Sequence, residues 1–330
     1  MSDTTDNTKL AVVVPCHNEE GNIAACYARL LRVVSRYDYT LLFVDDGSTD
    51  NTLSTLKQLS CDNPKVYYIS LSRNFGQQMA LKAGYDHVGY ADCVVCMDAD
   101  LQHPPESIPA LVDRWKEGYD VVNGIREISG GARLPLGKRV ASGLFYRLIN
   151  RFTEHTIIPN APDFRLLDRK VVQALAGFNE SGLYVKALIP WMGYKQSSIY
   201  FNVGQRYQGK SQYSTMRLLS LSLRAFVSGS IAPLRLATAV GCVFAALSFC
   251  YGFYAVYKYL FTNDTIAGWT SIIASILFIS GIQFLLMGVM GEYLGRTLLE
   301  VRGRPPYLVR EANCENLQIK HNEAMVKPHK

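Results

Sequence analysis

DCVVCMDADLQHPPE, residues 92–106, joins a short apolar run to two carboxylates that follow it at once. The run CVVCM has the length of a buried strand, and Pro104–Pro105 stops that strand and opens the next helix. In an extended backbone Asp98 and Asp100 point to the same side, because they are two residues apart. Two carboxylates this close repel each other unless a cation or a shared proton lies between them. The stretch therefore predicts a strand that ends where the two carboxylates need either a cation or a shared proton between them.

Apolar runs of similar length alternate with helical patterns along the first 205 residues. The runs that predict strands are 10–15, 40–46, 66–71, 92–97, 120–124 and 197–203. The predicted helices are Asn18 to about Arg36, Ser48 or Asp50 to about Leu59, 74–88, and Pro104 to about Trp115. This alternation predicts a doubly wound, Rossmann-like α/β fold with a mostly parallel sheet. Ligands of such sheets bind beyond the carboxyl ends of the strands, where three acidic pairs lie: Glu19–Glu20, Asp45–Asp46 and Asp98–Asp100.

The composition divides the chain into two unequal parts. Of its 330 residues 48% are apolar and 19% are charged, with a formal net charge of +6. Residues 1–205 have the composition of a globular domain, whereas residues 231–291 carry almost no charge. The basic residues gather near the apolar segments and in the tail, which favours an anionic membrane surface as the partner. Nucleic acid is not expected as a partner, since the aromatic-plus-basic pattern of single-strand binders is missing.

The eight cysteines form no disulfide framework. Cys93 and Cys96 make a lone CxxC inside an apolar run, which argues against zinc and for buried thiols in a reducing compartment. Residues 1–9, MSDTTDNTK, are polar and contain no apolar signal segment. We therefore expect a disordered N-terminus and a catalytic part that stays in the cytosol.

Two uncharged segments, about 232–260 and 267–291, are each long enough to cross a hydrocarbon layer of about 30 Å. Arginines precede the first and follow the second, so the positive-inside rule puts both termini in the cytosol of a multi-pass protein of the inner (plasma) membrane. Residues 212–230 predict a helix lying in the membrane surface, and a core-packing helix is the alternative. The predicted organisation is a disordered N-terminus (1–9), a cytosolic catalytic domain (10–211), a juxtamembrane amphipathic helix (212–230), a transmembrane hairpin (231–295) and a basic cytosolic tail (296–330).

The residue types at the strand ends suit a metal-bound anion. Mg²⁺ and Mn²⁺ prefer oxygen ligands and accept diphosphate oxygens in their shell, so Asp98 and Asp100 are candidate ligands. Gln102 can add a carbonyl oxygen two residues further on. Asp45–Asp46 can hydrogen-bond a ribose or a base N–H group, as acidic residues do at nucleotide sites. For either of these two aspartates alone, capping a turn is the alternative.

VVVPCHNEEGNI, VDDGSTDNT, LSRNFGQQMALKAG, MDADLQHPPE, DFRLLDR and RYQGKSQYS occur in this order, followed by two spans and by GEYLGR and RPPYLV. In combination they resemble the polyprenyl-phosphate glycosyltransferases, an inverting family 2 group with a GT-A nucleotide-sugar domain that includes the dolichyl-phosphate mannose synthases. The resemblance extends over about residues 10–310. The two-span tail is similar to that of the bactoprenol glucosyltransferase branch.

The resemblance implies roles for the residues that match its motifs. The nucleotide-sugar pocket would comprise Pro15, His17, Glu19, Asp45, Asp46, Asp98 and Lys210. The metal would be held by Asp98, Asp100 and Gln102, and the catalytic positions would be Asp100, Asp163 and Arg206.

A phosphate acceptor needs cations and positioning more than a strong base, because its second pKa is about 6 and it is mostly a dianion at neutral pH. We therefore interpret Asp163 as orienting the acceptor more than taking its proton. The predicted acceptor-phosphate residues are Arg133, Lys138, Arg139, Arg206 and Ser211. A solvated or lipid-facing basic surface is the alternative for the first three.

The resemblance implies transfer of a hexose, glucose from UDP-glucose in the branch resembled, to polyprenyl (undecaprenyl) phosphate at the cytosolic face. Donors that carry 4-formamido-arabinose, N-acetylhexosamine, galactose or mannose remain open, and the family favours a homo-oligomer. A processive synthase is disfavoured because the Arg114–Trp115 pair follows Asp100 instead of lying beyond Asp163. A non-catalytic membrane scaffold is disfavoured by the intact carboxylates.

Overall fold

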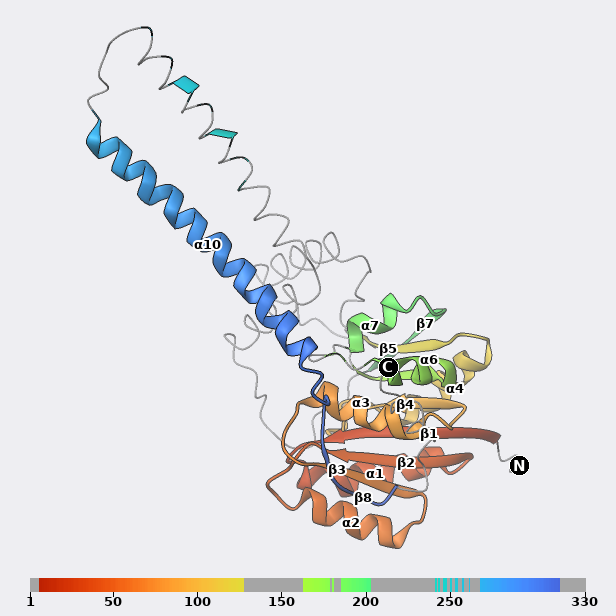
Figure 1. The fold of residues 1–330 in the computed structure, drawn as a ribbon. Coiled ribbons are helices and arrows are strands. Elements are labelled where there is room, and N and C mark those ends of the chain that lie inside the picture. The colour runs from red at the N-terminus through yellow and green to blue at the C-terminus, as the bar shows by residue number, and fades with distance from the viewer. Residues whose placement is uncertain are drawn as a thin grey trace, which may run out of the picture. The chain divides into compact units, whose positions relative to one another are not determined.

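The computed structural model describes residues 6–127, 163–178, 180, 185–202 and 268–314, together with nine separate positions between 241 and 261. The chain divides into two compact units (Figure 1). One consists of Met1–Asn150, Glu154–Gln212 and Pro305–Lys330, and the other of Arg151–Thr153 and Tyr213–Arg304.

The first unit is built on an eight-stranded sheet. Its strands are β1 (Asp6–Cys16), β2 (Tyr37–Asp45), β3 (Val66–Leu71), β4 (Cys93–Cys96), β5 (Val121–Glu127), β6 (Arg165–Asp168), β7 (Gln196–Asn202) and β8 (Val309–Ala312). They lie in the order β7-β5-β6-β4-β1-β2-β3-β8, and only β6 and β8 run against the others. The predicted α/β fold with a mostly parallel sheet is confirmed.

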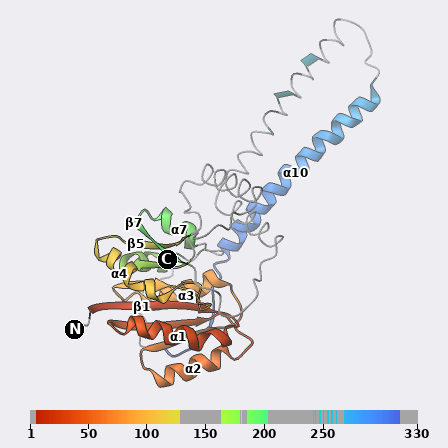
Figure 2. The same cartoon turned by 180° about the vertical axis from the view of Figure 1, so that it is seen from behind.

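Helices cover both faces of this sheet (Figures 1 and 2). One layer contains α1 (Glu20–Val34), α2 (Thr52–Asp62), the short 3₁₀ helix η1 (Pro105–Ser107) and α4 (Ile108–Lys116); the other contains α3 (Gln77–Val88), α6 (Arg169–Ala176) and α7 (Val185–Trp191). In β1, Leu10 and Val12 pack into the first layer while Ala11 and Val13 pack into the second. Because a strand of this kind is buried on both faces, it reads in the sequence as an unbroken apolar run.

The strand order reverses at β1, which has β2 on one side and β4 on the other. At this switch point the carboxyl ends of neighbouring strands lie together, which is where open α/β sheets bind ligands. The amide of Met97 donates to the carbonyl of Val13 (3.2 Å), and the amide of Asp46 donates to that of Cys16 (2.8 Å). The sheet therefore brings the acidic ends of β1, β2 and β4 to one edge, as the sequence predicts.

The N-terminal boundary differs from the prediction. Asp6–Lys9 belongs to β1, although residues 1–9 were expected to be disordered. Asp6 pairs with Tyr37 of β2, and its carboxylate forms an ion pair with Lys116 of α4. Pairing with a neighbouring strand orders a polar segment that has no local structural signal.

The first helix begins after its predicted cap. Asn18 has a φ of 55°, and the helix starts at Glu20. The side-chain oxygen of Asn18 accepts from the amide of Thr49 (2.8 Å), and the backbone amide of Asn18 donates to the Ser48 hydroxyl (3.0 Å). Asn18 therefore joins the loops after β1 and β2, because its short polar side chain tolerates the left-handed conformation.

The segment assigned to a basic tail contains the edge strand β8, which pairs with β3. Arg310 donates to the Ser70 hydroxyl (3.0 Å), and Glu311 forms an ion pair with Lys57 (2.7 Å). The hydroxyl of Tyr307 donates to Asp86 of α3 (2.8 Å). The C-terminal segment is thus part of the first unit, where it covers the edge of β3.

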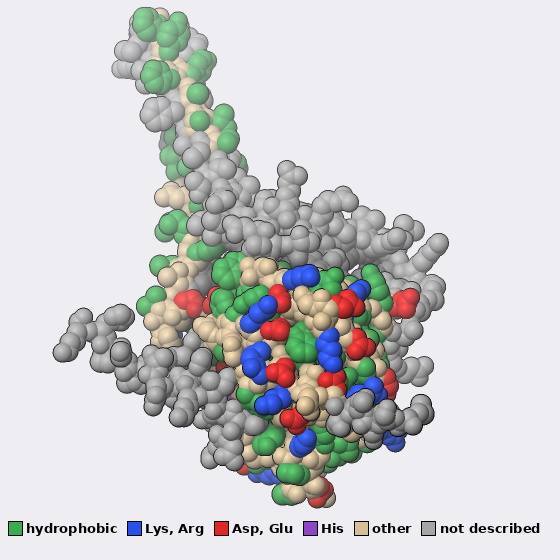
Figure 3. Space-filling model, turned by 90° about the vertical axis from the view of Figure 1, so that its right-hand side faces the viewer, with side chains coloured by type: hydrophobic (Ala, Val, Ile, Leu, Met, Phe, Trp, Pro, Cys, Tyr) green, Lys and Arg blue, Asp and Glu red, His purple; other side chains and the backbone are tan. Residues whose placement is uncertain are grey.

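In the second unit the described helix α10 (Trp269–Val301) covers the second predicted span and continues ten residues beyond its predicted end at 291. Within it Phe278–Val301 is, by length and composition alone, the one segment of the described residues that can cross a membrane. Large apolar side chains such as Phe278, Met290 and Leu294 are exposed along it. By contrast, the first unit shows interspersed basic and acidic side chains on the face drawn in Figure 3.

The other membrane-related predictions fall mainly outside the described residues. The nine described positions of the first predicted span are helical: Gly241, Val243, Ala246, Leu247, Cys250, Phe253, Tyr254, Tyr257 and Phe261. The amphipathic helix 212–230 lies wholly outside the described residues.

Candidate active site

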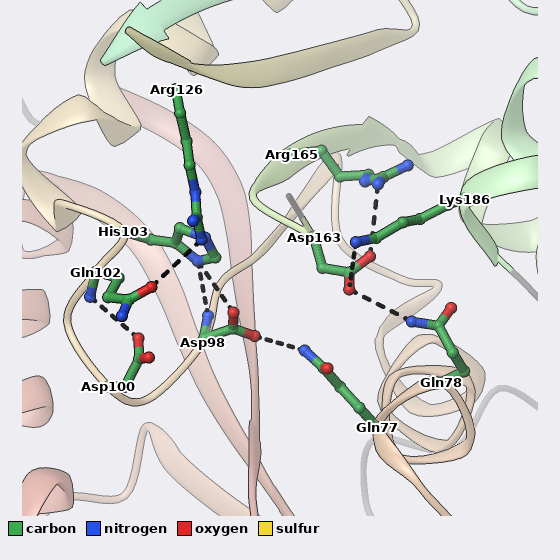
Figure 4. A network of polar contacts seen from close by, with 10 residues as sticks. All are labelled: Gln77, Gln78, Asp98, Asp100, Gln102, His103, Arg126, Asp163, Arg165 and Lys186. Atoms are coloured by element: carbon green, nitrogen blue, oxygen red, sulfur yellow. Dashed lines mark hydrogen bonds and ion pairs between the residues drawn. The ribbon is translucent and has the colours of Figure 1, made fainter. Parts of the chain in front are cut away.

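The loop after β4 carries the two aspartates of the DxD pattern. Residues 99–100 form a turn, and Leu101 is buried with a φ of 62°. The carboxylate of Asp100 accepts from the amide of Gln102 (3.1 Å) within this loop, whereas that of Asp98 faces the start of α3 (Figure 4). The predicted same-side arrangement on an extended strand is therefore wrong. The chain leaves the sheet after Cys96, and the turn sends the two side chains in different directions.

Asp98 is held by Gln77 of α3 and by His103 of its own loop. Its carboxylate accepts from the Nε2 amide of Gln77 (2.7 Å), and its backbone amide donates to Nδ1 of His103 (3.1 Å). The His103 ring is buried and stacks on Phe164, with 5.3 Å between ring centroids. Burial, followed by the nearby charge of Arg126, lowers the pKa of His103 to about 4. The imidazole is therefore neutral and serves as a hydrogen-bond acceptor that fixes the DxD loop.

The charge state of Asp98 depends on its surroundings. Burial, and then the charges of Asp163 and Asp100, raise the pKa of Asp98 to about 7, although 30% of its side chain is exposed. Besides burial, the carboxylates of Asp163 and Asp100 contribute negative charge at this point. A divalent cation would offset that charge.

This raised pKa predicts how the stability of the metal-free protein depends on pH. Between about 4 and about 7 folded Asp98 binds a proton that the unfolded chain has lost, so its stabilising contribution disappears as the pH rises through about 7. Thermal unfolding in a chelator should therefore show stability falling over that range, and less steeply in the Asp98→Asn variant. Equal pH dependence in the two proteins would contradict the raised pKa.

Asp163 lies two residues before the start of β6 and is 5% exposed. One carboxylate oxygen lies 3.3 Å from Nζ of Lys186 and 3.3 Å from Nε2 of Gln78, and the other lies 3.5 Å from Nη2 of Arg165 (Figure 4). The sequence interpretation assigned no role to these three partners. Arg165 is detectable in principle, since it stands two residues from Asp163, whereas Lys186 comes from α7 and has no sequence signal.

The loops after β1 and β2 form the predicted nucleoside end. Nδ1 of His17 lies 2.9 Å from the carbonyl oxygen of Asp46. The Asp46 carboxylate is buried and accepts from the amides of Phe75 (2.7 Å) and Gly76 (2.8 Å). Glu19 accepts from Asn22 (2.5 Å), in the first turn of α1. These residues come together as predicted. Both carboxylate oxygens of Asp46 accept hydrogen bonds from the loop before α3.

Asp45 and Pro15 of the predicted nucleotide pocket are buried as well. Asp45 is 0% exposed, and its carboxylate accepts from the amide of Ser48 (3.0 Å) and the hydroxyl of Ser70 (2.8 Å). This corrects the predicted role of Asp45, because it stabilises the end of β2 and is closed to a ligand. Pro15 is buried within β1 opposite Val44.

The turn after β2 depends on a glycine. Gly47 has a φ of 63°, and a Cβ atom there would lie 2.4 Å from the backbone carbon of Arg73. Only glycine permits both the positive φ and this approach of the loop after β3. The close approach brings the segment before α3 to the acidic strand ends.

The donor set fits a hard divalent cation in part. Asp98 and Asp100 supply carboxylates, and Gln102 supplies an amide oxygen that lies 3.4 Å from Nη2 of Arg126. No group of three His, Cys, Asp or Glu side chains that could hold a metal occurs among the residues that the structure describes. The protein would therefore provide two carboxylates, with further oxygens coming from a bound diphosphate.

The remaining predicted site residues lie outside the described ranges. They are Arg133, Lys138, Arg139, Arg206, Lys210 and Ser211.

Comparison with known proteins identifies the family of both parts of the chain. Residues 11–176 match the family described as glycosyl transferase family 2, and residues 232–297 match the GtrB C-terminal hairpin. An uncharacterized glycosyltransferase of Synechocystis sp. is 39% identical over 92% of this chain and 95% of its own length. The SfII prophage-derived bactoprenol glucosyl transferase of Shigella flexneri is 36% identical over 93% and 99%.

Among solved structures, glucosyl-3-phosphoglycerate synthase from Mycobacterium tuberculosis has a TM-score of 0.45 at 17% identity, covering 68% of this chain and 79% of its own. The sequence relationships extend over nearly the whole length of this chain and of its relatives. The protein is thus a glycosyltransferase that belongs to glycosyl transferase family 2.

Proposed function

We propose that this enzyme transfers glucose from UDP-glucose to polyprenyl phosphate at the cytosolic face of a membrane, with inversion at the anomeric carbon. The observation that carries the proposal is the near full-length match to relatives named bactoprenol glucosyl transferase, at 36% identity. That match includes the hairpin segment, so the likeness is not confined to the nucleotide-binding half. The described site supports it, because Asp98 and Asp163 accept from adjacent residues of α3, Gln77 and Gln78 (Figure 4).

On the donor side, Asp98 and Asp100 would hold Mg²⁺ or Mn²⁺, with Gln102 beside them. When bound, such a cation neutralises the charge that develops on the leaving nucleoside diphosphate. His17, Glu19 and Asp46 lie at the ends of β1 and β2, next to the switch point of the sheet. This placement supports their predicted contact with the nucleoside.

On the acceptor side, a phosphate oxygen attacks the anomeric carbon while the bond from that carbon to UDP breaks, and UDP leaves with its electron pair. No proton has to move, because the acceptor phosphate is already mostly a dianion. The oxygens of Asp163 already contact Lys186, Arg165 and Gln78. We therefore assign Asp163 to positioning the acceptor and its neighbouring cations.

The membrane half would keep the site close to a lipid substrate. The apolar segment of α10 and the hairpin match support a membrane-bound enzyme. A multi-pass arrangement with both termini in the cytosol rests on the charge pattern, as do the acceptor roles of Arg133, Lys138 and Arg139.

The decisive test is a donor screen with the purified full-length protein, undecaprenyl phosphate and Mg²⁺ or Mn²⁺. Each donor is supplied alone, and the lipid product is identified by mass. Product from UDP-glucose but not from UDP-galactose supports the proposal. Product from another donor alone would keep the reaction class and replace the sugar, whereas nucleotide binding without turnover of any donor would favour the scaffold.

Lys186 provides a separate test of the acceptor side. Its side chain is 26% exposed beside Asp163, so its ammonium group can reach a ligand. We expect Lys186→Ala to raise the KM for polyprenyl phosphate about tenfold, because a charge-assisted bond to phosphate is lost. The KM for the donor should stay the same.

Lys170→Ala is the matched control, because Lys170 is 55% exposed and pairs with Asp120 at 2.7 Å. Lys186→Arg should restore most of the acceptor affinity. Equal changes in both KM values, or no change in either, would refute the assignment of Lys186.

A further inference from the structure

Four consecutive residues before and at the start of α3, Phe75–Gln78, contact three acidic groups of the site. The amides of Phe75 and Gly76 donate to Asp46. The side-chain amide of Gln77 donates to Asp98 (2.7 Å), and that of Gln78 donates to Asp163 (3.3 Å). One short segment thus touches the carboxylates assigned to the nucleoside, to the metal and to the acceptor. Figure 4 shows the contacts with the last two, Asp98 and Asp163.

This segment is anchored to a rigid part of the fold. The amides of Met79 and Ala80 donate to the carbonyl of Gly76 (2.9 and 3.1 Å), so the helix begins directly at the contacts. Along α3 most side chains are buried, and a Cβ atom on Gly84 would lie 2.3 Å from Val13 of β1. Because α3 packs this closely on the central strand, its first turn has a defined position relative to the strand ends.

The two glutamines differ in what else they contact. The side-chain oxygen of Gln78 accepts from the amide of Val185 at the start of α7 (3.1 Å), which leaves its NH₂ group facing Asp163. Gln77 is exposed and reaches only towards the DxD loop in Figure 4. The adjacent side chains therefore bind different carboxylates. Gln78 also accepts a hydrogen bond from the first residue of α7, the helix that carries Lys186.

We propose that Gln77 and Gln78 are positioning residues that set the separation between the donor site and the acceptor site, Gln77 through Asp98 and Gln78 through Asp163. Both side-chain amides belong to the first turn of α3. The positions of the two carboxylates are therefore fixed relative to the same rigid helix. Each glutamine donates to its carboxylate without adding a charge to the site. A fixed spacing of this kind is what an in-line displacement requires.

The proposal rests on the proposed function, and the test separates the two glutamines. Gln77→Met keeps the length of the side chain and removes the donor. We expect it to weaken Mn²⁺ binding in the presence of UDP by about 3- to 10-fold, with an unchanged KM for polyprenyl phosphate, since one hydrogen bond to a charged group is lost. Binding is followed by electron paramagnetic resonance on the full-length protein.

For Gln78 the informative variant is Gln78→Glu. A glutamate keeps an oxygen for the amide of Val185, so α7 stays anchored, but it turns a carboxylate towards Asp163. We expect kcat or acceptor affinity to fall about tenfold while Mn²⁺ binding stays within twofold of the wild type. Gln173→Met on α6 is the control, because its amide donates to the carbonyl of Gly89 (3.2 Å), away from the site.

The outcomes are distinguishable. Wild-type kinetics in Gln78→Glu, or equal effects of the Gln77 and Gln78 variants on both substrates, would overturn the division of roles. If the wild type turns over no donor, the proposed function fails by itself. The Mn²⁺ and UDP binding of the two variants would still decide the part of the inference that concerns Asp98.

Discussion

Replacing Asp100 by asparagine should lower the rate of glycosyl transfer by about 100-fold or more while the protein still folds and inserts. Asparagine retains a side-chain oxygen, so the hydrogen bond from the amide of Gln102 can persist. The substitution therefore removes charge and leaves the turn of the DxD loop intact. Radiolabelled donor and polyprenyl phosphate measure the rate, and circular dichroism checks the fold.

Asp113→Asn is the control for this substitution, because Asp113 is an exposed aspartate on the neighbouring helix α4. It should retain the wild-type rate. An Asp100→Asn protein that works within a few-fold of the wild type would remove the DxD loop from the metal site.

The second large effect concerns stability. Lys82 is 2% exposed, and its ammonium donates to Asp86 (2.5 Å) and to the carbonyl of Ala176 (3.1 Å). Burial raises the pKa of Asp86, against the lowering effect of Lys82, so the carboxylate depends on its partner. We expect Lys82→Met to lower the free energy of unfolding by about 3 kcal/mol, because it leaves a largely buried carboxylate without its ion-pair partner. The melting temperature should fall by roughly 6–12 °C for a domain of this size.

Two further variants test that explanation in thermal unfolding of the detergent-solubilised chain. Adding Asp86→Leu to Lys82→Met should recover part of the loss, because both charges are then gone. Lys65→Met should cost less than about 1 kcal/mol, since Lys65 and Asp38 are 46% and 56% exposed. A Lys82→Met protein as stable as the wild type would show that the ion pair contributes nothing.

The Asp86 carboxylate of this ion pair also accepts a hydrogen bond from the C-terminal segment. Tyr307 donates to the second oxygen of Asp86 from a position 221 residues away in the sequence. Tyr307 is followed at once by β8, whose residues Arg310 and Glu311 contact β3 and α2. The sequence predicted only a basic tail over residues 296–330. The four residues of β8 are partly exposed, and they show no hydrophobic periodicity that would mark a strand.

Local patterns were sufficient for several elements built from neighbouring residues, although the short helices α6 and α7 were not predicted. The strand 66–71 was predicted at its observed bounds, and β4 within one residue, since short apolar runs ended by turn residues are specific signals. The four-residue strand β6 was missed. It enters antiparallel between β4 and β5, and such an insertion depends on pairing across the sheet.

By itself the sequence determined the alternating strands and helices, and with them the edge at which Asp46 and Asp98 meet. That follows because parallel strands share a direction, so residues at their carboxyl ends must lie together. Only the tertiary structure decided what each carboxylate faces. Asp98 accepts a hydrogen bond from Gln77. Asp163 accepts one from Gln78 and pairs with Lys186, whereas Asp45 is fully buried. These contacts join side chains from separate elements, and the packing of α3 and α7 on the sheet sets them, which no local pattern encodes.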